Sequence, residues 1–124
     1  PNQPGGLWSK RVGGELQGLL AIANDTVYGA TEQGKVFARD AITGNKRGST
    51  RLSVEISTAP TVAGNTVLVG SKNGTIFGLD ARTGDVLWDF NVSHEEIVDS
   101  PIVAGNIIYV VSADGTLYAL SGAQ

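Results

Sequence analysis

The sequence predicts an all-β fold built from repeated four-stranded antiparallel units, and three observations lead to this prediction. First, one motif recurs about every 40 residues, a period that is typical of β-propeller blades. Second, each copy contains short apolar or β-branched runs separated by turn residues, and 17 of the 124 residues are glycine. Third, no segment combines an apolar stripe with helix caps. We therefore expect a β-propeller architecture.

The repeat is clearest around the third strand of each unit. Residues 34–44 read GKVFARDAITG, residues 74–84 read GTIFGLDARTG, and residues 115–122 read GTLYALSG. The register also holds before this motif, because VAGN occurs at residues 62–65 and again at residues 103–106. Three copies in one register indicate three consecutive blades.

Four strands are expected in each unit, and they follow in a fixed order. The first are short apolar runs at residues 19–23, 60–63 and 101–104, which we expect to be inner strands buried on both faces. The second are β-branched runs at residues 26–31, 67–71 and 107–112, and the third lie at residues 35–39, 75–79 and 116–120. Tight hairpins join the second strands to the third, and Thr-Gly turns lead into a fourth strand that carries tryptophan.

The conspicuous residues of the motif have structural roles that follow from their chemistry. The hairpin glycines suit positions of positive φ, and the aspartates suit hydrogen bonds to the turn amides that precede each Thr-Gly pair. The tryptophans are expected to wedge between neighbouring blades, while Gly48 stands at the tryptophan position of the middle copy. These motif residues are Gly34, Gly74, Gly115, Asp40, Asp80, Trp8 and Trp88.

Residues 74–88, which read GTIFGLDARTGDVLW, carry the most complete copy of the motif. This pattern resembles the repeat of PQQ-type β-propellers, the quinoprotein-like and BamB-like family, and the resemblance covers nearly the whole chain. It implies a non-catalytic binding or scaffolding module that contacts a protein partner in the periplasm or outside the cell. Two alternatives stay open. One is a fragment of a PQQ-dependent dehydrogenase, which would imply PQQ and calcium. The other is an extracytoplasmic sensor domain for a small ligand. We assign no cofactor to any residue.

The expected domain organisation has a linker followed by three repeats. Residues 1–6 have the composition of a flexible linker, and residues 7–124 hold repeats at approximately 16–52, 56–92 and 97–121, with residues 7–12 as a latch strand. Propellers typically contain about four to eight blades, so three blades would leave open sheet edges. Either two copies exchange latch strands to close a six-bladed homodimer, or these residues belong to a larger parent propeller.

Glutamate recurs at one repeat position, just before each first strand, as Glu15, Glu55 and Glu96. By propeller geometry these carboxylates would form a partial acidic ring near the central channel, with Glu32, Asp99 and Asp114 as further members. Such a ring attracts cations or basic partners. The alternative is that glutamate is only a polar loop residue that was duplicated with the repeat.

The single histidine, His94, lies beside Glu95 and Glu96 in the connection before the third repeat. A histidine beside two carboxylates suits a metal site or a general base, but neighbouring residues on an irregular loop do not readily converge. No nucleophile motif, P-loop or dinucleotide fingerprint occurs, and the chain has no cysteine. We therefore expect a solvated loop, no catalytic or metal-binding residue, and no enzyme activity.

Charge and hydropathy restrict the class of partner. The net charge is −3 and only 17% of residues are charged, which argues against nucleic acid because phosphate binding needs a basic stripe. No apolar run approaches the ~18 residues that a membrane-spanning helix needs. A protein partner is the class that remains most consistent with the sequence.

Overall fold

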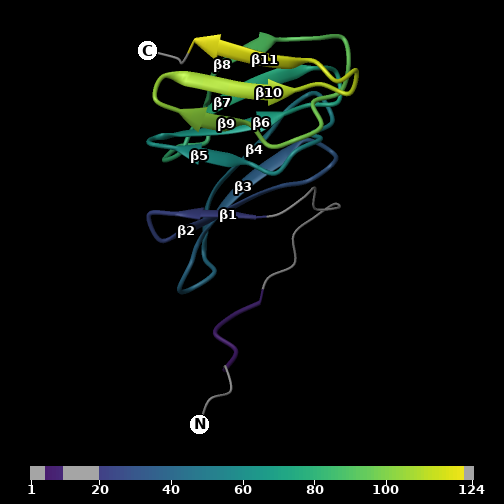
Figure 1. Ribbon diagram of the computed structural model, residues 1–124. Coiled ribbons are helices and arrows are strands. Elements are labelled where there is room, and N and C mark those ends of the chain that lie inside the picture. The colour runs from purple at the N-terminus through teal and green to yellow at the C-terminus, as the bar shows by residue number, and fades with distance from the viewer. Residues whose placement is uncertain (1–4, 10–19, 122–124) are drawn as a thin grey trace.

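The computed structural model describes residues 5–9 and 20–121, and these residues form strands and turns but no helix. The described strands make three antiparallel sheets that lie face to face in chain order (Figure 1). Blade 1 contains β1 (Ala21–Ala23), β2 (Thr26–Ala30), β3 (Lys35–Asp40) and β4 (Lys46–Arg51). Blade 2 contains β5 (Thr61–Ala63), β6 (Thr66–Gly70), β7 (Thr75–Asp80) and β8 (Val86–Asn91). Blade 3 contains β9 (Ile102–Ala104), β10 (Ile107–Val111) and β11 (Leu117–Ser121).

Within every sheet, each strand pairs only with strands that neighbour it in the sequence. The prediction of an all-β, propeller-type fold with antiparallel blades is confirmed, and the described part of blade 3 has three of the four strands. None of the described residues belongs to a helix that is long and apolar enough to span a bilayer.

The strand register repeats from blade to blade, so equivalent positions form a row across each sheet. In blade 2 this row runs from Leu68 through Gly78 to Trp88, where a Cβ on Gly78 would lie 2.4 Å from the Trp88 ring. In blade 1 the corresponding row ends at Gly48. The row therefore fixes which residues of different blades can be compared.

Two apolar clusters hold the blades together. Between blades 1 and 2, the cluster includes Tyr28, Val36 and Leu79, and between blades 2 and 3 it includes Ile76 and Ile108 (the full sets are larger). A fully buried leucine or isoleucine stabilises the fold by about 1.5–3 kcal/mol relative to an exposed one. Blade 2 contributes to both clusters and is the most buried of the three blades.

The expectation that the first strands are buried on both faces was wrong. The three strands β1, β5 and β9 contain no buried residue, and Ile22 and Ile102 are largely exposed. Each of these strands lies at the edge of its sheet and pairs on one side only. A short apolar run was therefore not sufficient to indicate burial on both faces of a strand.

The predicted latch strand lies partly outside the described residues, since residues 10–12 are not among them. Leu7, Trp8 and Ser9 are described, and they are not in a strand. The pairing expected for a latch is therefore not formed by these three residues with any described part of the chain.

Candidate functional site

The connections between blades and the β2–β3-type hairpin turns form one surface, which we call the loop face. It comprises the turns at residues 31–34, 71–74 and 112–115 and the connections at residues 52–58 and 92–99. Backbone hydrogen bonds join these pieces: the amide of Lys72 donates to the carbonyl of Glu55 at 2.9 Å, and Ala113 donates to Glu96 at 2.8 Å. The repeated glutamate therefore uses its backbone to connect two turns, which leaves its side chain available.

The side chains of the loop face place two carboxylates beside one lysine. Lys72 Nζ lies 2.6 Å from Glu32 Oε2 and 3.9 Å from Glu55 Oε1, and these contacts link the turns of blades 1 and 2. The hydrogen bond that Lys72 donates to Glu32 raises the pKa of Lys72, desolvation opposes this effect, and the charges of Glu32, Glu55 and Glu96 add to it. The charges of Glu55 and Glu96 thus act on the same lysine, a group that the expected acidic ring did not include.

The other predicted members of this surface do not converge into a ligand set. His94, Glu95 and Asp99 are exposed, Glu96 is half-buried, and Glu15 lies outside the described residues. Over residues 5–9 and 20–121, no group of three or more histidine, aspartate or glutamate side chains is placed to hold a metal ion.

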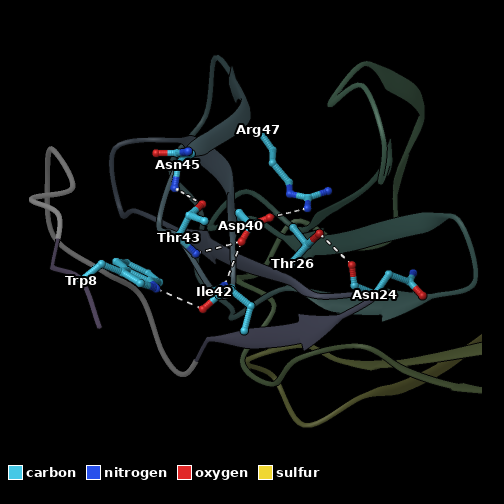
Figure 2. A network of polar contacts seen from close by, with 9 residues as sticks. Trp8, Asn24, Thr26, Asp40, Ile42, Thr43, Asn45 and Arg47 are labelled. Carbon is cyan, nitrogen blue, oxygen red and sulfur yellow. Dashed lines mark hydrogen bonds and ion pairs between the residues drawn. The ribbon is translucent and has the colours of Figure 1, made fainter. Parts of the chain in front are cut away.

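At the opposite ends of the strands, Asp40 organises the turn between β3 and β4 (Figure 2). Its Oδ1 accepts hydrogen bonds from the amides of Ile42 at 2.8 Å and Thr43 at 2.9 Å, while Arg47 contacts Oδ2 at 2.6 Å. The bond from Arg47, followed by those from the two amides, holds the pKa of Asp40 well below its usual range. Asp40 is therefore a turn-forming residue, which is the role expected from its position before Thr-Gly.

Asp80 repeats this arrangement in blade 2. Its Oδ1 accepts from the amides of Arg82 at 2.7 Å and Thr83 at 3.1 Å, and these bonds lower the pKa of Asp80. The turn ends at Gly84, which has a φ of 83°. The motif aspartates are thus occupied by the backbone of their own turns.

The two tryptophans differ in the parts of the blades that they contact. Trp8 packs on the turn of blade 1, where a Cβ on Gly44 would lie 2.4 Å from its ring, and its Nε1 donates to the carbonyl of Ala41 at 3.0 Å (Figure 2). Trp88 packs against the apolar cluster between blades 2 and 3. Among the described residues Trp88 therefore lies between two blades, whereas Trp8 contacts blade 1 alone.

At the seam between blades 1 and 2, sequence reasoning missed the residue that replaces the tryptophan. Gly48 has no side chain, and the hydroxyl of Tyr28 donates instead to the carbonyl of Ala81 at 3.2 Å. Ala81 occupies the same repeat position as Ala41, which accepts from Trp8. The signal that could have found Tyr28 is the row Tyr28–Ala38–Gly48, because these three residues lie opposite one another on β2, β3 and β4.

The hairpin glycines adopt the predicted left-handed conformation. Gly34, Gly74 and Gly115 have φ values of 106°, 85° and 86°. A Cβ on Gly74 would also lie 2.0 Å from the carbonyl oxygen of Ser93, whereas a Cβ on Gly115 would meet no atom within 4 Å. Glycine is therefore required by the backbone conformation at both Gly74 and Gly115, and close packing adds to this requirement at Gly74, where the connection after β8 passes.

Comparison with known families identifies the repeat. A family model described as the outer membrane protein assembly factor BamB matches residues 2–124. The chain belongs to the BamB family. No curated protein matches the chain significantly in sequence.

Solved structures with the same fold include a BamB and a designed protein. BamB from Moraxella catarrhalis superposes with a TM-score of 0.82 and is 26% identical, and the match covers 92% of this chain and 37% of that one. The computationally designed Ika8 protein has a TM-score of 0.73 and 25% identity, covering 82% of this chain and 32% of that one. This BamB-family chain therefore spans about a third of the length of these two proteins.

A quinoprotein enzyme shares the fold as well. The quinohemoprotein alcohol dehydrogenase ADHIIG from Pseudomonas putida HK5 superposes with a TM-score of 0.76 at 16% identity, over 85% of this chain and 19% of the enzyme. At this level of identity the similarity shows only that the BamB-family chain and the enzyme use the same blade architecture.

Proposed function

We propose that this chain is a non-catalytic β-propeller module that binds a protein partner through its loop face, in the periplasm or another compartment outside the cytoplasm. Membership of the BamB family over residues 2–124 supports this role, because the family is described as an outer membrane protein assembly factor. The family relationship supplies the class of function, and the loop face supplies a surface on which it can act.

The proposal rests on the different roles of backbone and side chain in the repeated glutamates. The carbonyl oxygens of Glu55 and Glu96 accept hydrogen bonds from the next turn, so the fold holds these residues in place by their backbones. Glu55 is exposed, and Glu96 is half-buried. A carboxylate whose backbone is held in place and whose side chain is not buried is suited to contact another molecule.

The charge of the loop face defines the partner that it suits. Glu32 and Glu55 form ion pairs with Lys72, the charge of Glu96 also acts on it, and His94 and Glu95 lie exposed on the adjoining connection. Carboxylates therefore outnumber the cationic group, and the surface attracts a basic patch over about a Debye length, ~8 Å at physiological ionic strength. We expect the partner to be a protein that presents lysine or arginine to this face.

Site-specific photo-cross-linking tests the proposal. A photoreactive phenylalanine derivative at His94, on the loop face, should give a discrete adduct with a protein partner in the cell envelope, because the partner covers this position. The matched position is Thr43, which is also exposed but lies on the turns at the other end of the strands. An adduct at position 94 that is absent at position 43 is the expected result.

The carboxylates can then be tested in the same assay. Glu55→Gln combined with Glu96→Gln removes two charges without changing side-chain size, and the yield of the adduct should fall several-fold. Equal adducts at positions 43 and 94, or an unchanged yield in the double variant, would show that the loop face is not the binding surface.

A further inference from the structure

The seam between blades 1 and 2 lacks the aromatic ring that covers the equivalent turn of blade 1. Trp8 packs on the turn at residues 41–44, where a Cβ on Gly44 would lie 2.4 Å from its ring (Figure 2). One repeat later, Gly48 stands in the place of Trp8, and Gly84 stands in the place of Gly44. Among the described residues, a Cβ on Gly84 would meet only the hydroxyl oxygen of Thr50, at 2.9 Å. The turn at residues 81–84 therefore has the place for an indole but no indole.

The space beside Gly48 is open. A Cβ on Gly48 would meet no atom of the described residues within 4 Å except the carbonyl oxygen of Thr83, at 3.8 Å. A narrow cavity of about 20 Å³, which has room for a single water molecule, is bordered by Gly48 and Ala81. Tyr28 and Arg82 line both this cavity and a wider groove of about 390 Å³. The groove therefore adjoins the place where the ring is missing.

Two arginines line the groove, one from each blade. Arg47 lies on β4 and Arg82 lies in the turn between β7 and β8, and both are exposed. Arg47 contacts Asp40 at 2.6 Å, but a guanidinium carries five N–H donors, so the others remain for a ligand. Arg82 forms no ion pair with a carboxylate of the described residues. Asp80 borders the space next to Arg82, but its Oδ1 is held by the amides of its own turn. The groove therefore suits a ligand that carries carboxylates.

The groove also presents groups that match a polypeptide backbone. Asn24 and Asn65 line it from the turns that follow β1 and β5. A side-chain amide carries both a hydrogen-bond donor and an acceptor, as each peptide unit of a ligand does. An aromatic place, two arginines and two amides thus lie along one groove between two blades.

We propose that this groove binds a tryptophan side chain on an acidic segment of another protein. The indole packs on the turn at residues 81–84 beside Gly48, as Trp8 packs on the turn at residues 41–44. Arg82 lines the same place, and a guanidinium over the face of a tryptophan ring adds a favourable cation–π contact. Carboxylates beside the tryptophan pair with Arg47 and Arg82. The site lies on the turns opposite the loop face, so it does not depend on the loop face binding a partner.

Calorimetric titration of the chain with short capped peptides tests the proposal. The peptide Asp-Gly-Trp-Gly-Asp should bind about tenfold more tightly than Asp-Gly-Ala-Gly-Asp, because the alanine peptide buries no ring. It should also bind several-fold more tightly than Lys-Gly-Trp-Gly-Lys, because the lysines are repelled by the two arginines. Absence of binding, or equal affinity for the three peptides, would overturn the proposal.

Gly48→Trp shows whether the peptide binds at this seam. The φ of Gly48 is not in the left-handed region, so its backbone accepts a side chain, and the new ring fills the place of the peptide's indole. The affinity for Asp-Gly-Trp-Gly-Asp should fall about tenfold, while the melting temperature should rise by a few degrees because the seam gains apolar contacts. An unchanged affinity in this folded variant would place the peptide elsewhere and refute the site.

A pair of arginine variants tests the charge of the groove. Arg82→Gln should weaken binding of Asp-Gly-Trp-Gly-Asp about fivefold, because it removes one cation from the groove. Arg51→Gln is the matched control, since Arg51 is exposed on the same strand as Gly48 but lines neither the cavity nor the groove. An equal effect of the two variants would show that the arginines act only through the overall charge of the protein, which would contradict the proposal.

Discussion

At the scale of single residues, two equivalent carbonyl groups receive hydrogen bonds from different aromatic side chains. Trp8 donates to Ala41 and Tyr28 donates to Ala81, although Tyr28 comes from a second strand and Trp8 precedes the first. Thr50 also donates to the carbonyl of Gly84 at the seam where Gly48 lacks a side chain. The seam thus retains its polar contacts after losing the tryptophan.

Tyr28→Phe tests whether this replacement stabilises the seam. The variant removes the hydroxyl from a buried residue and leaves the Ala81 carbonyl without this donor, so the free energy of unfolding should fall by about 1 kcal/mol. Urea denaturation measures the change. Tyr118→Phe is the control, because the Tyr118 hydroxyl makes no recorded hydrogen bond with a described residue, and it should change stability much less. A similar loss in both variants would contradict the assignment.

Asp40 provides a test based on protonation. Arg47 is the largest cause of the low pKa of Asp40, whereas in Asp80 the turn amides are the largest cause. Arg47→Gln should therefore raise the pKa of Asp40 toward its usual value and leave that of Asp80 in place, as followed by carboxyl NMR during a pH titration.

The sign of the pH dependence follows from the depressed pKa of Asp40. Its contribution to stability is present above the unfolded value, about 3.9, and is lost as the pH falls through the lower folded value. In Arg47→Gln this loss should begin at a higher pH than in the unsubstituted chain. An Asp40 titration that is unaffected by the substitution would show that the turn amides alone set its pKa.

At the scale of elements, the hairpins and turns could be predicted because their residue types are nearly obligatory. Asn73-Gly74 and Asp114-Gly115 turn where the sequence indicates, and the Thr-Gly pairs end the turns that lead into β4 and β8. The burial of β1, β5 and β9 could not be predicted, since a short apolar run does not by itself say how much of a strand its neighbours cover.

Two of these turns form a matched pair for testing the need for glycine. Gly74 and Gly115 have nearly the same positive φ, but only at Gly74 would a Cβ collide with the carbonyl oxygens of Ser93 and Glu95. Gly115→Ala should cost about 1–2 kcal/mol, the usual penalty for a left-handed alanine. Gly74→Ala should cost clearly more, because the backbone of a neighbouring connection must also move. Thermal and urea unfolding of both variants would compare the costs, and equal losses would argue against the clash.

At the scale of the whole molecule, the repeat predicted which positions of the loop face are equivalent, but it did not predict the charges on that face. Glu55 and Glu96 lie at equivalent places because three copies keep one register, and this followed from the sequence. Lys72 did not follow, since it occupies the turn position that is Glu32 in blade 1 and Ala113 in blade 3. Where the charge at one repeat position differs between copies, its effect on the surface can be assigned only when the fold shows which residues it faces.

The pairing of each strand with its neighbours in the sequence also bears on how the chain folds. Hairpins of this kind close short loops, so each blade can form at little entropic cost before any long-range contact is made. Blade 2 has an interface on both sides, whereas the described parts of blades 1 and 3 share one such cluster each. In a linear array whose cooperativity comes from nearest neighbours, a unit with two interfaces gains more stability from its neighbours than a unit with one, so we expect blade 2 to be the most stable of the three described blades.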